Sequence, residues 1–232
     1  MTIRNLEGFF KPRSVAVIGA SDRARSVGNT LLENLMQGGF KGQILPVNPR
    51  HRSLCGLPGH ASVANLPITP DLAVICTPPP TVPGLIADLA ARGTRAAIVI
   101  TAGLGALTDD GGTTLKQQML AAARPYLLRI LGPNCIGLLV PAIGLNASFA
   151  HTGALGGDVA FVSQSGALVT AVLDWAKSRG IGFSKFVSIG DSADVDFGDL
   201  IDYLGSDAET RAILLYIESI HAARKFMSAA RA

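Results

Sequence analysis

Short apolar runs rich in valine, isoleucine and leucine alternate along this chain with amphipathic stretches of helical periodicity. In the first 140 residues the pattern predicts helices over about 26–37, 83–92 and 113–123. Continuous apolar runs between helices are typical of parallel strands that are buried on both faces. Residues 1–140 are therefore predicted to form an α/β domain built on a doubly wound parallel sheet. Its strands are expected at Ser14–Ile18, Gln43–Val47, Asp71–Cys76, Ala96–Thr101 and Arg129–Leu131.

The alternation is interrupted over residues 141–158, where small residues and glycines predict an irregular linker between two domains. It resumes over residues 159–232, which form a second predicted α/β domain. Only three strand–helix units fit there, whereas an open sheet usually has about five strands. We therefore expect an incomplete domain of a longer protein, with an unprotected sheet edge that favours self-association. The predicted strands are 159–162, 185–188 and 212–217, and the helices are 165–179, 197–204 and 222–232.

Composition narrows the class of protein. The chain has 232 residues, of which 48% are hydrophobic and 16% charged, as expected for a well-buried α/β protein. A net charge of +3 without a Lys/Arg cluster gives no indication of a nucleic-acid partner. No apolar run approaches the ~20 residues of a membrane span, and the N-terminus lacks a signal-peptide pattern. Cys55, Cys76 and Cys135 fit neither a disulfide framework nor a metal site, so we expect a cytoplasmic protein with reduced thiols.

The junction between the first strand and the first helix is a candidate anion site. The turn Gly19-Ala20-Ser21 follows the strand directly, and backbone N–H groups at such a helix start bind phosphates. A dinucleotide site would show G-x-G-x-x-G and an acid near the end of the second strand. Here the next glycine is Gly28, and the second strand ends at Asn48-Pro49-Arg50. Both departures argue against NAD and, with Arg50, favour a pyrophosphate or phosphorylated ribose; the alternative is that Gly19 only permits a tight strand-to-helix turn.

Three further loops follow strands and are expected to meet the first turn at the carboxyl edge of the sheet, where ligands bind. They are residues 76–80, 101–105 and 132–135. Their prolines remove N–H donors and present apolar surface that suits an adenine ring or a pantetheine arm, although a rigid turn explains Pro78–Pro80 as well. The predicted cofactor-binding residues are Gly19, Ala20, Ser21, Val27, Asn48, Pro49, Arg50, Cys76, Thr77, Pro78, Pro79, Thr101, Ala102, Gly103 and Asn134.

A second strand–turn–helix junction repeats this pattern. Ser163, Gln164, Ser165 and Gly166 come between an apolar run and a long helix, and we predict that they bind phosphate. Simple capping of the helix by the two serines is the alternative. The G-x-S-x-G pattern of hydrolases is a poor fit, because no glycine lies two residues before Ser165.

Several motifs together resemble the NDP-forming (ADP-forming) acyl-CoA synthetases, relatives of the succinyl-CoA synthetase α subunit. The resemblance implies a Rossmann-like CoA-binding domain followed by a flavodoxin-like domain, with CoA or acyl-CoA as the ligand. It also implies an ATP-grasp partner domain or subunit that uses ATP or ADP, and a phosphohistidine whose phosphate faces the second anion site. The motifs are Val17–Ser21, Ser26–Gly28, Pro46–Pro49, Asp71–Ile75, Gly132–Cys135 and Ser163–Gly166.

The histidine of the family is not expected in this chain. His151-Thr152-Gly153 nearly spells the family's motif, but it lies in the predicted linker, before Ser163. We therefore predict no catalytic residue within the chain and place the phosphohistidine beyond Ala232.

The stretch around Asp191-Ser192 points to one branch of this resemblance. The synthetases more often carry Asn-Lys there, and the Gly-Asp-Ser form is similar to the synthetase-like region of bacterial protein lysine acetyltransferases. That similarity implies an acyl-CoA-sensing region with a GNAT domain as partner. Asp191 would also disfavour a nearby phosphate, and with it synthetase activity, unless it is paired or metal-bound. The alternatives are part of an active acetate or acyl-CoA ligase (ADP-forming), or an NAD(P)-binding oxidoreductase, although we find no Tyr-x-x-x-Lys pair for the latter.

Overall fold

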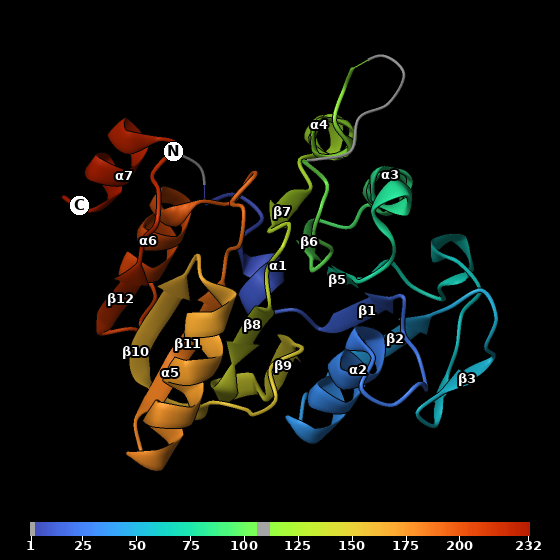
Figure 1. The fold of residues 1–232 in the computed structure, drawn as a ribbon, viewed down its shortest axis with the longest axis horizontal. Helices are drawn as coiled ribbons and strands as arrows, with labels where there is room; N and C mark the ends of the chain where they lie inside the picture. Colours follow the sequence, from blue (N-terminus) through green and yellow to red (C-terminus); the bar gives the residue numbers. More distant parts are fainter. Residues whose placement is uncertain (1–2, 106–111) are drawn as a thin grey trace.

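The computed structural model describes residues 3–105 and 112–232, which form two packed α/β units (Figure 1). The first unit contains a parallel five-stranded sheet in the order β2-β1-β5-β6-β7. The direction of winding reverses between β1 and β5, and this confirms the predicted doubly wound sheet. The strands are β1 (Ser14–Ile18), β2 (Gln43–Val47), β5 (Leu72–Ile75), β6 (Ala96–Val99) and β7 (Arg129–Leu131).

Helices cover both faces of this sheet, because its central strands present apolar side chains to both sides. Within β1, Val15 and Val17 belong to the apolar cluster that includes α2 (Val27–Gln37). Ala16 and Ile18 point the other way, into the cluster of α3 (Val82–Arg92) and α4 (Leu115–Ala123). The remaining short elements of this unit are β3 (Ser53–Leu54), β4 (Leu57–Pro58), η1 (Val63–Asn65), η2 (Pro79–Thr81) and η3 (Arg124–Tyr126).

The second unit is a mixed sheet in the order β12-β10-β11-β8-β9. Its three parallel strands confirm the predicted ones: β10 (Leu155–Ser163), β11 (Gly182–Ser188) and β12 (Ala212–Tyr216). The strand β8 (Gly137–Val140) runs antiparallel to β11, and β9 (Leu145–Ser148) runs antiparallel to β8. The helix α5 (Gly166–Ser178) covers one face, and α6 (Phe197–Gly205) with α7 (Ala223–Ala229) lies on the other (Figure 1).

The segment 141–158, predicted to be irregular, contains ordered strands, so that prediction was wrong. After the short helix η4 (Pro141–Ile143), Gly144 turns the chain with φ +67°, and β9 follows. Leu145 and Ala147 are buried, and the side-chain amide of Asn34 in α2 donates to the carbonyl oxygen of Ser148 at 2.8 Å. A hairpin of small residues is stable here because it packs against the first unit.

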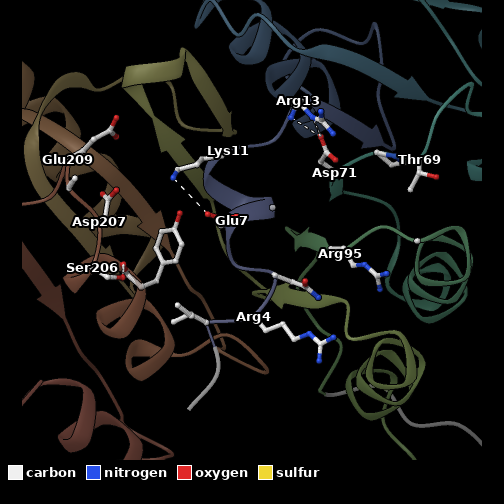
Figure 2. Close-up of a pocket in the computed structure, with 17 residues that line it drawn as sticks. Arg4, Glu7, Lys11, Arg13, Thr69, Asp71, Arg95, Ser206, Asp207 and Glu209 are labelled. Carbon is white, nitrogen blue, oxygen red and sulfur yellow. Dashed lines mark hydrogen bonds and ion pairs between the residues drawn. The ribbon is translucent and has the colours of Figure 1, made fainter.

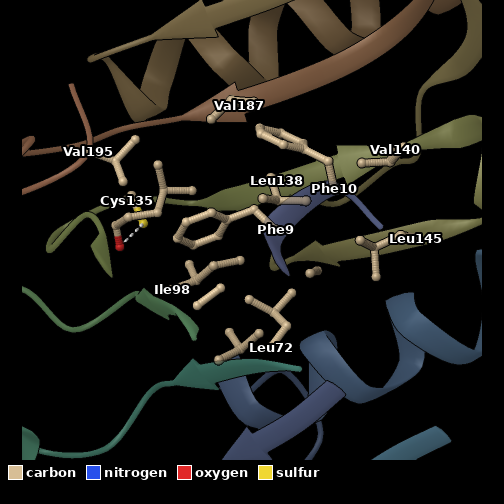
Figure 3. Close-up of a cluster of buried hydrophobic side chains, with 14 of the residues drawn as sticks. Phe9, Phe10, Leu72, Ile98, Cys135, Leu138, Val140, Leu145, Val187 and Val195 are labelled. Carbon is tan, nitrogen blue, oxygen red and sulfur yellow. Dashed lines mark hydrogen bonds between the residues drawn. The ribbon is translucent and has the colours of Figure 1, made fainter. Parts of the chain in front are cut away.

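The two units share one apolar core (Figure 3). Phe9 and Phe10, from the short helix α1 (Glu7–Phe10), lie between strands of both sheets, with Leu72 on one side and Val187 on the other. Phe10 also stacks on Tyr203 of α6, with ring centroids 4.8 Å apart. The relative position of the units is therefore held by buried contacts rather than by a flexible connection. Among residues 3–105 and 112–232, no helix combines the length and apolarity needed to cross a bilayer.

Candidate functional site

A cleft of about 720 Å³ opens between the carboxyl edge of the first sheet and the start of α5. Both predicted groups of site residues contribute to its wall. From the cofactor set these are Val27, Cys76, Thr77, Pro78, Pro79, Thr101, Ala102 and Asn134, and from the phosphate set Gln164 and Gly166. Ile100, Cys135, Ile136 and Phe149 complete the lining with apolar surface; they were not among the predicted site residues, although Cys135 belongs to the loop expected there.

The Gly19 turn adjoins this cleft and depends on close backbone packing. Gly19 has φ +95°, and a Cβ there would lie 3.0–3.1 Å from atoms of Cys76 and Thr77. A Cβ on Gly28, at the second position of α2, would lie only 2.0 Å from the carbonyl oxygen of Gly19. Gly28 was absent from the predicted site, although its position at the predicted helix start was a usable signal. The two glycines bring strand, helix and the 76–77 loop together.

Asn48 connects the first turn to the loop after β2. Its side-chain amide donates to the carbonyl oxygen of Ala20 at 2.8 Å, and its Oδ1 accepts the N–H of Arg50 at 2.8 Å. Ser21 Oγ accepts the N–H of Arg23 at 3.0 Å. Pro49 and Arg50 are exposed, so the Arg50 guanidinium is accessible beside the turn. Asn48 is therefore a positioning residue, and positive charge lies where a dinucleotide site would carry an acid.

The loops after β5, β6 and β7 are linked in series. Thr101 Oγ1 donates to the carbonyl oxygen of Thr77 at 2.8 Å, and the N–H of Asn134 donates to the carbonyl oxygen of Thr101 at 3.1 Å. Burial raises the pKa of the Cys76 thiol to about 12, and burial raises that of Cys135 to about 12 as well. Both thiols are therefore protonated at neutral pH and form apolar wall rather than nucleophiles. Gly103 is exposed next to this wall.

The predicted phosphate-binding side chains are occupied by contacts within the protein. Ser163 is fully buried, and its Oγ accepts the N–H of Ser165 at 3.1 Å. Ser165 Oγ caps α5 by accepting the N–H of Leu168 at 3.4 Å. Gln164 Oε1 accepts the N–H groups of Glu218 and Ser219, at 2.6 and 2.9 Å. The group that remains available to a ligand in the cleft is the backbone at Gly166, where α5 begins. Its N–H has no acceptor within the helix.

Asp191 is held by hydrogen bonds to the loop after β7, and both partners are neutral groups. Its Oδ1 accepts from the side-chain amide of Asn134 at 3.1 Å, and its N–H donates to the carbonyl oxygen of Pro133 at 2.9 Å. Asn134 lines the cleft, so this hydrogen bond joins the second unit to the cofactor loops. His151 instead contacts Asp174, with 2.7 Å between Nε2 and Oδ1, and lies outside the cleft lining. Within the described ranges no cluster of His, Cys, Asp and Glu has the arrangement of a metal site.

A larger cavity of about 970 Å³ lies at the opposite, amino edge of the first sheet (Figure 2). Charges of both signs line it, and several are already matched within the wall. Lys11 Nζ lies 3.9 Å from Glu7 Oε1, and the backbone N–H of Arg13 donates to Asp71 Oδ2 at 2.8 Å. Ligands of open α/β sheets bind at the carboxyl ends of the strands. The smaller cleft is therefore the stronger candidate.

Comparison with protein families divides the chain into the same two units as the structure. Residues 13–141 match the model of the CoA binding domain, and residues 156–232 match that of the succinyl-CoA ligase like flavodoxin domain. The acetate–CoA ligase [ADP-forming] I of Archaeoglobus fulgidus is 39% identical over 97% of this chain, which spans 33% of that ligase. The α subunit of the corresponding Pyrococcus furiosus enzyme is 38% identical over 98% of this chain, which spans 50% of that subunit.

Solved structures show the same fold. The acetyl-coenzyme A synthetase 1 of Candidatus Korarchaeum cryptofilum, in complex with phosphate and ADP, superposes with a TM-score of 0.91 at 38% identity. The match covers 97% of this chain and 48% of that one, so the chain spans about half the length or less of these relatives. The chain belongs to the CoA-binding domain family, and it resembles the N-terminal CoA-binding part of the ADP-forming acyl-CoA synthetases, as the sequence motifs indicated.

Proposed function

We propose that this chain binds CoA or acyl-CoA along the 720 Å³ cleft, with the phosphates at the Gly19 turn and the pantetheine arm over the 76–79 and 101–102 loops. The observation that carries the proposal is that a single cleft joins the 76–79 and 101–102 loops to the start of α5, and the Gly19 turn packs directly against Cys76 and Thr77 of its wall. The turn offers backbone N–H groups at a helix start, and the loops offer apolar wall. The thiol end of the ligand then points toward Gly166.

Electrostatics support the position of the phosphates. Arg23, Arg25 and Arg50 are exposed on the two loops that flank the turn. The nearest loop acid, Asp22, accepts the N–H of Cys55 through Oδ1 at 2.6 Å, so its carboxylate is directed to the β3–β4 hairpin. Cationic side chains around backbone donors are the usual environment of bound phosphate groups.

We infer that the whole protein is an ADP-forming acyl-CoA ligase, to which this chain contributes the CoA half. The start of α5 would receive the phosphate of an acyl phosphate or phosphohistidine, since a helix N-terminus favours anions. The relatives that cover this chain almost completely are ADP-forming ligases and α subunits of such ligases. In this proposal an ATP-grasp domain or subunit supplies ATP or ADP, and the phosphohistidine comes from outside residues 1–232.

The second candidate is an acyl-CoA-sensing region of a protein lysine acetyltransferase with a GNAT partner. Asp191 favours it, because this carboxylate lies at the rim of the cleft, bonded to Asn134. A carboxylate opposes a phosphate nearby but does not oppose a neutral acyl group. Titration of inorganic phosphate into the wild-type chain and into Asp191→Asn separates the two: a ligase should bind phosphate in both, and a sensor only in the variant.

Ser21→Glu should weaken CoA binding at least about tenfold, because the added carboxylate lies against the pyrophosphate. Isothermal titration of CoA, acetyl-CoA and NAD measures the effect, with Ser178→Glu, at an exposed position of α5, as the matched control. Equal CoA affinity in the two variants would place the phosphates elsewhere. Binding of NAD without CoA would refute the CoA assignment in favour of an oxidoreductase.

Ser165→Ala should leave CoA affinity within about twofold of wild type while lowering the free energy of unfolding by about 1 kcal/mol. The reason is that Ser165 Oγ caps α5 and does not contact the Gly19 turn. Chemical denaturation and the same CoA titration report the two effects separately. A large loss of CoA affinity with unchanged stability would mean that the Ser165 hydroxyl contacts the ligand directly.

A further inference from the structure

Asn134, in the loop after β7, places a carboxamide in the wall of the 720 Å³ cleft. Its backbone has φ +58°, in the left-handed region that asparagine adopts more readily than most residues, and its N–H donates to the carbonyl oxygen of Thr101 at 3.1 Å. Its side-chain Nδ2 donates to Asp191 Oδ1 at 3.1 Å. Backbone and side chain are both tied to neighbouring segments, so the amide has a defined direction.

Asp191 determines which end of this amide is available to a ligand. A carboxylate accepts hydrogen bonds and donates none, so only the Nδ2 end of Asn134 can pair with it. The amide oxygen, Oδ1, is then the end directed away from Asp191, and it has no hydrogen-bond partner among residues 3–105 and 112–232. The cleft therefore presents a hydrogen-bond acceptor at this point of its wall.

The segment that carries Asp191 is held against the same loop by its backbone. The N–H of Asp191 donates to the carbonyl oxygen of Pro133, and the N–H of Ala193 donates to that of Gly132, both at 2.9 Å. Gly190 has φ +53°, and a Cβ there would lie 2.3 Å from the carbonyl oxygen of Pro133. These main-chain contacts do not involve the carboxylate, so a substitution of the Asp191 side chain should leave the segment in place.

The other polar side chains of the lining already bond within the protein. Thr101 Oγ1 donates to the carbonyl oxygen of Thr77 at 2.8 Å, and Thr77 Oγ1 lies 2.7 Å from Thr81 Oγ1. Gln164 Oε1 accepts two backbone N–H groups. Asn134 Oδ1 is therefore the side-chain acceptor of the lining that is best placed to receive a donor from the ligand.

The spacing of the strands indicates which part of CoA reaches Asn134. The Gly19 turn follows β1, Asn134 follows β7, and β5 and β6 lie between them, so three strand spacings of about 4.8 Å, roughly 14 Å in all, separate the two loops. The pantetheine arm, from the phosphate oxygen to the sulfur, has the backbone length of about four peptide residues, roughly 14 Å when extended. Its last amide lies about one residue length before the sulfur. That amide therefore comes within hydrogen-bonding reach of Asn134, with the thiol just beyond it toward Gly166.

We propose that Asp191 is a positioning residue that turns the Asn134 amide oxygen toward the ligand, where this oxygen accepts the N–H of the pantetheine amide nearest the sulfur. The inference rests on the proposed CoA function and adds a specific contact to it. An amide N–H is a strong donor and a thiol is a weak one, so the acceptor matches the amide rather than the thiol. CoA and acyl-CoA share the contact, because both carry this amide.

Isothermal titration of the 232-residue chain with CoA, and with a CoA analogue in which an ester oxygen replaces that N–H, tests the contact. The wild type should bind the ester analogue about tenfold more weakly than CoA, because the ester oxygen then faces Asn134 Oδ1. Asn134→Gly removes the amide without straining the φ of +58°, and should reduce this ratio to about twofold or less. Asp191→Ala should also reduce the ratio, because the released amide can turn either end toward the ligand. Asp88→Ala, which removes an exposed carboxylate from α3, is the matched control and should discriminate like the wild type.

The ratio of the two affinities is the result that a purely structural role would leave unchanged. Equal discrimination by the wild type and Asn134→Gly would overturn the contact, and equal discrimination by Asp191→Ala and Asp88→Ala would overturn the positioning role. Asn134→Gly should weaken CoA and acetyl-CoA alike; an effect on CoA alone would move the contact to the thiol and overturn its assignment to the amide. A wild type that bound no CoA would instead refute the proposed function, so the two failures are distinguishable.

Discussion

Gly28→Ala should reduce CoA affinity by at least about a hundredfold, the largest effect we expect from any single substitution at the cleft. The new Cβ would lie 2.0 Å from the carbonyl oxygen of Gly19 and 3.1 Å from the Cα of Ala20. Both neighbours are backbone, so no side-chain rotation relieves the overlap. The start of α2 must move away from the turn, and the N–H groups that face the phosphates move with it. Isothermal titration with CoA measures the loss.

Gly84→Ala is the matched control for this substitution. Gly84 lies in α3 of the same unit, and a Cβ there meets no atom of the described residues within 4 Å. Alanine should therefore preserve CoA affinity and slightly raise helix stability. Thermal unfolding of both variants distinguishes a local change from a global one. If Gly28→Ala bound CoA as tightly as Gly84→Ala, the Gly19 turn would not be the phosphate site.

Arg129→Ala should lower the free energy of unfolding by about 2–3 kcal/mol, because it removes one of the two cations beside the buried carboxylate of Asp199 together with the cation bonded to Asp194. Arg129 Nη2 lies 2.8 Å from Asp199 Oδ2, and its Nε lies 2.9 Å from Asp194 Oδ2. Asp199 is 1% exposed, and its Oδ1 has no hydrogen-bond partner among the described residues. Lys225, 2.7 Å from Oδ2, would be the principal remaining cation.

Urea denaturation of Arg129→Ala and of Arg124→Ala measures this contribution. Arg124 is exposed in the same region of the chain, and its loss should change the free energy of unfolding by no more than about 0.5 kcal/mol. Comparable small effects in the two variants would mean that the ion pairs around Asp199 stabilise the fold little. Since Arg129 begins β7 and Asp199 lies in α6, the variant also tests how firmly the two units are joined.

The first sheet could be predicted because its strands are continuous apolar runs, as in Ser14–Ile18 and Leu72–Ile75. The hairpin β8–β9 could not. Asn146 and Ser148 in β9 read as loop residues, yet both are buried, and Ser148 Oγ donates to Asn146 Oδ1 at 2.6 Å. Their burial depends on α2, more than a hundred residues earlier, and such a contact leaves no local pattern.

The candidate site also has a part that the sequence predicts and a part that it does not. The position of each loop at the carboxyl edge followed from strand order, so the lining by Thr77 and Thr101 could be predicted. The hydrogen-bond partners of Gln164 could not be predicted. Its Oε1 accepts hydrogen bonds from the N–H groups of Glu218 and Ser219, which lie 54 and 55 residues later in the chain. Local sequence identified a polar turn, and only the folded chain shows which of its polar atoms remain available.

The core around Phe9 and Phe10 joins two regions that the family models treat as separate domains. One family model ends at residue 141 and the other begins at residue 156, so each half of the chain corresponds to a separate evolutionary domain. The apolar cluster that contains Leu72, Leu138 and Val187 crosses that boundary. We therefore expect the two modules to unfold as one cooperative unit, and a replacement of either module would have to preserve its contacts with Phe9 and Phe10.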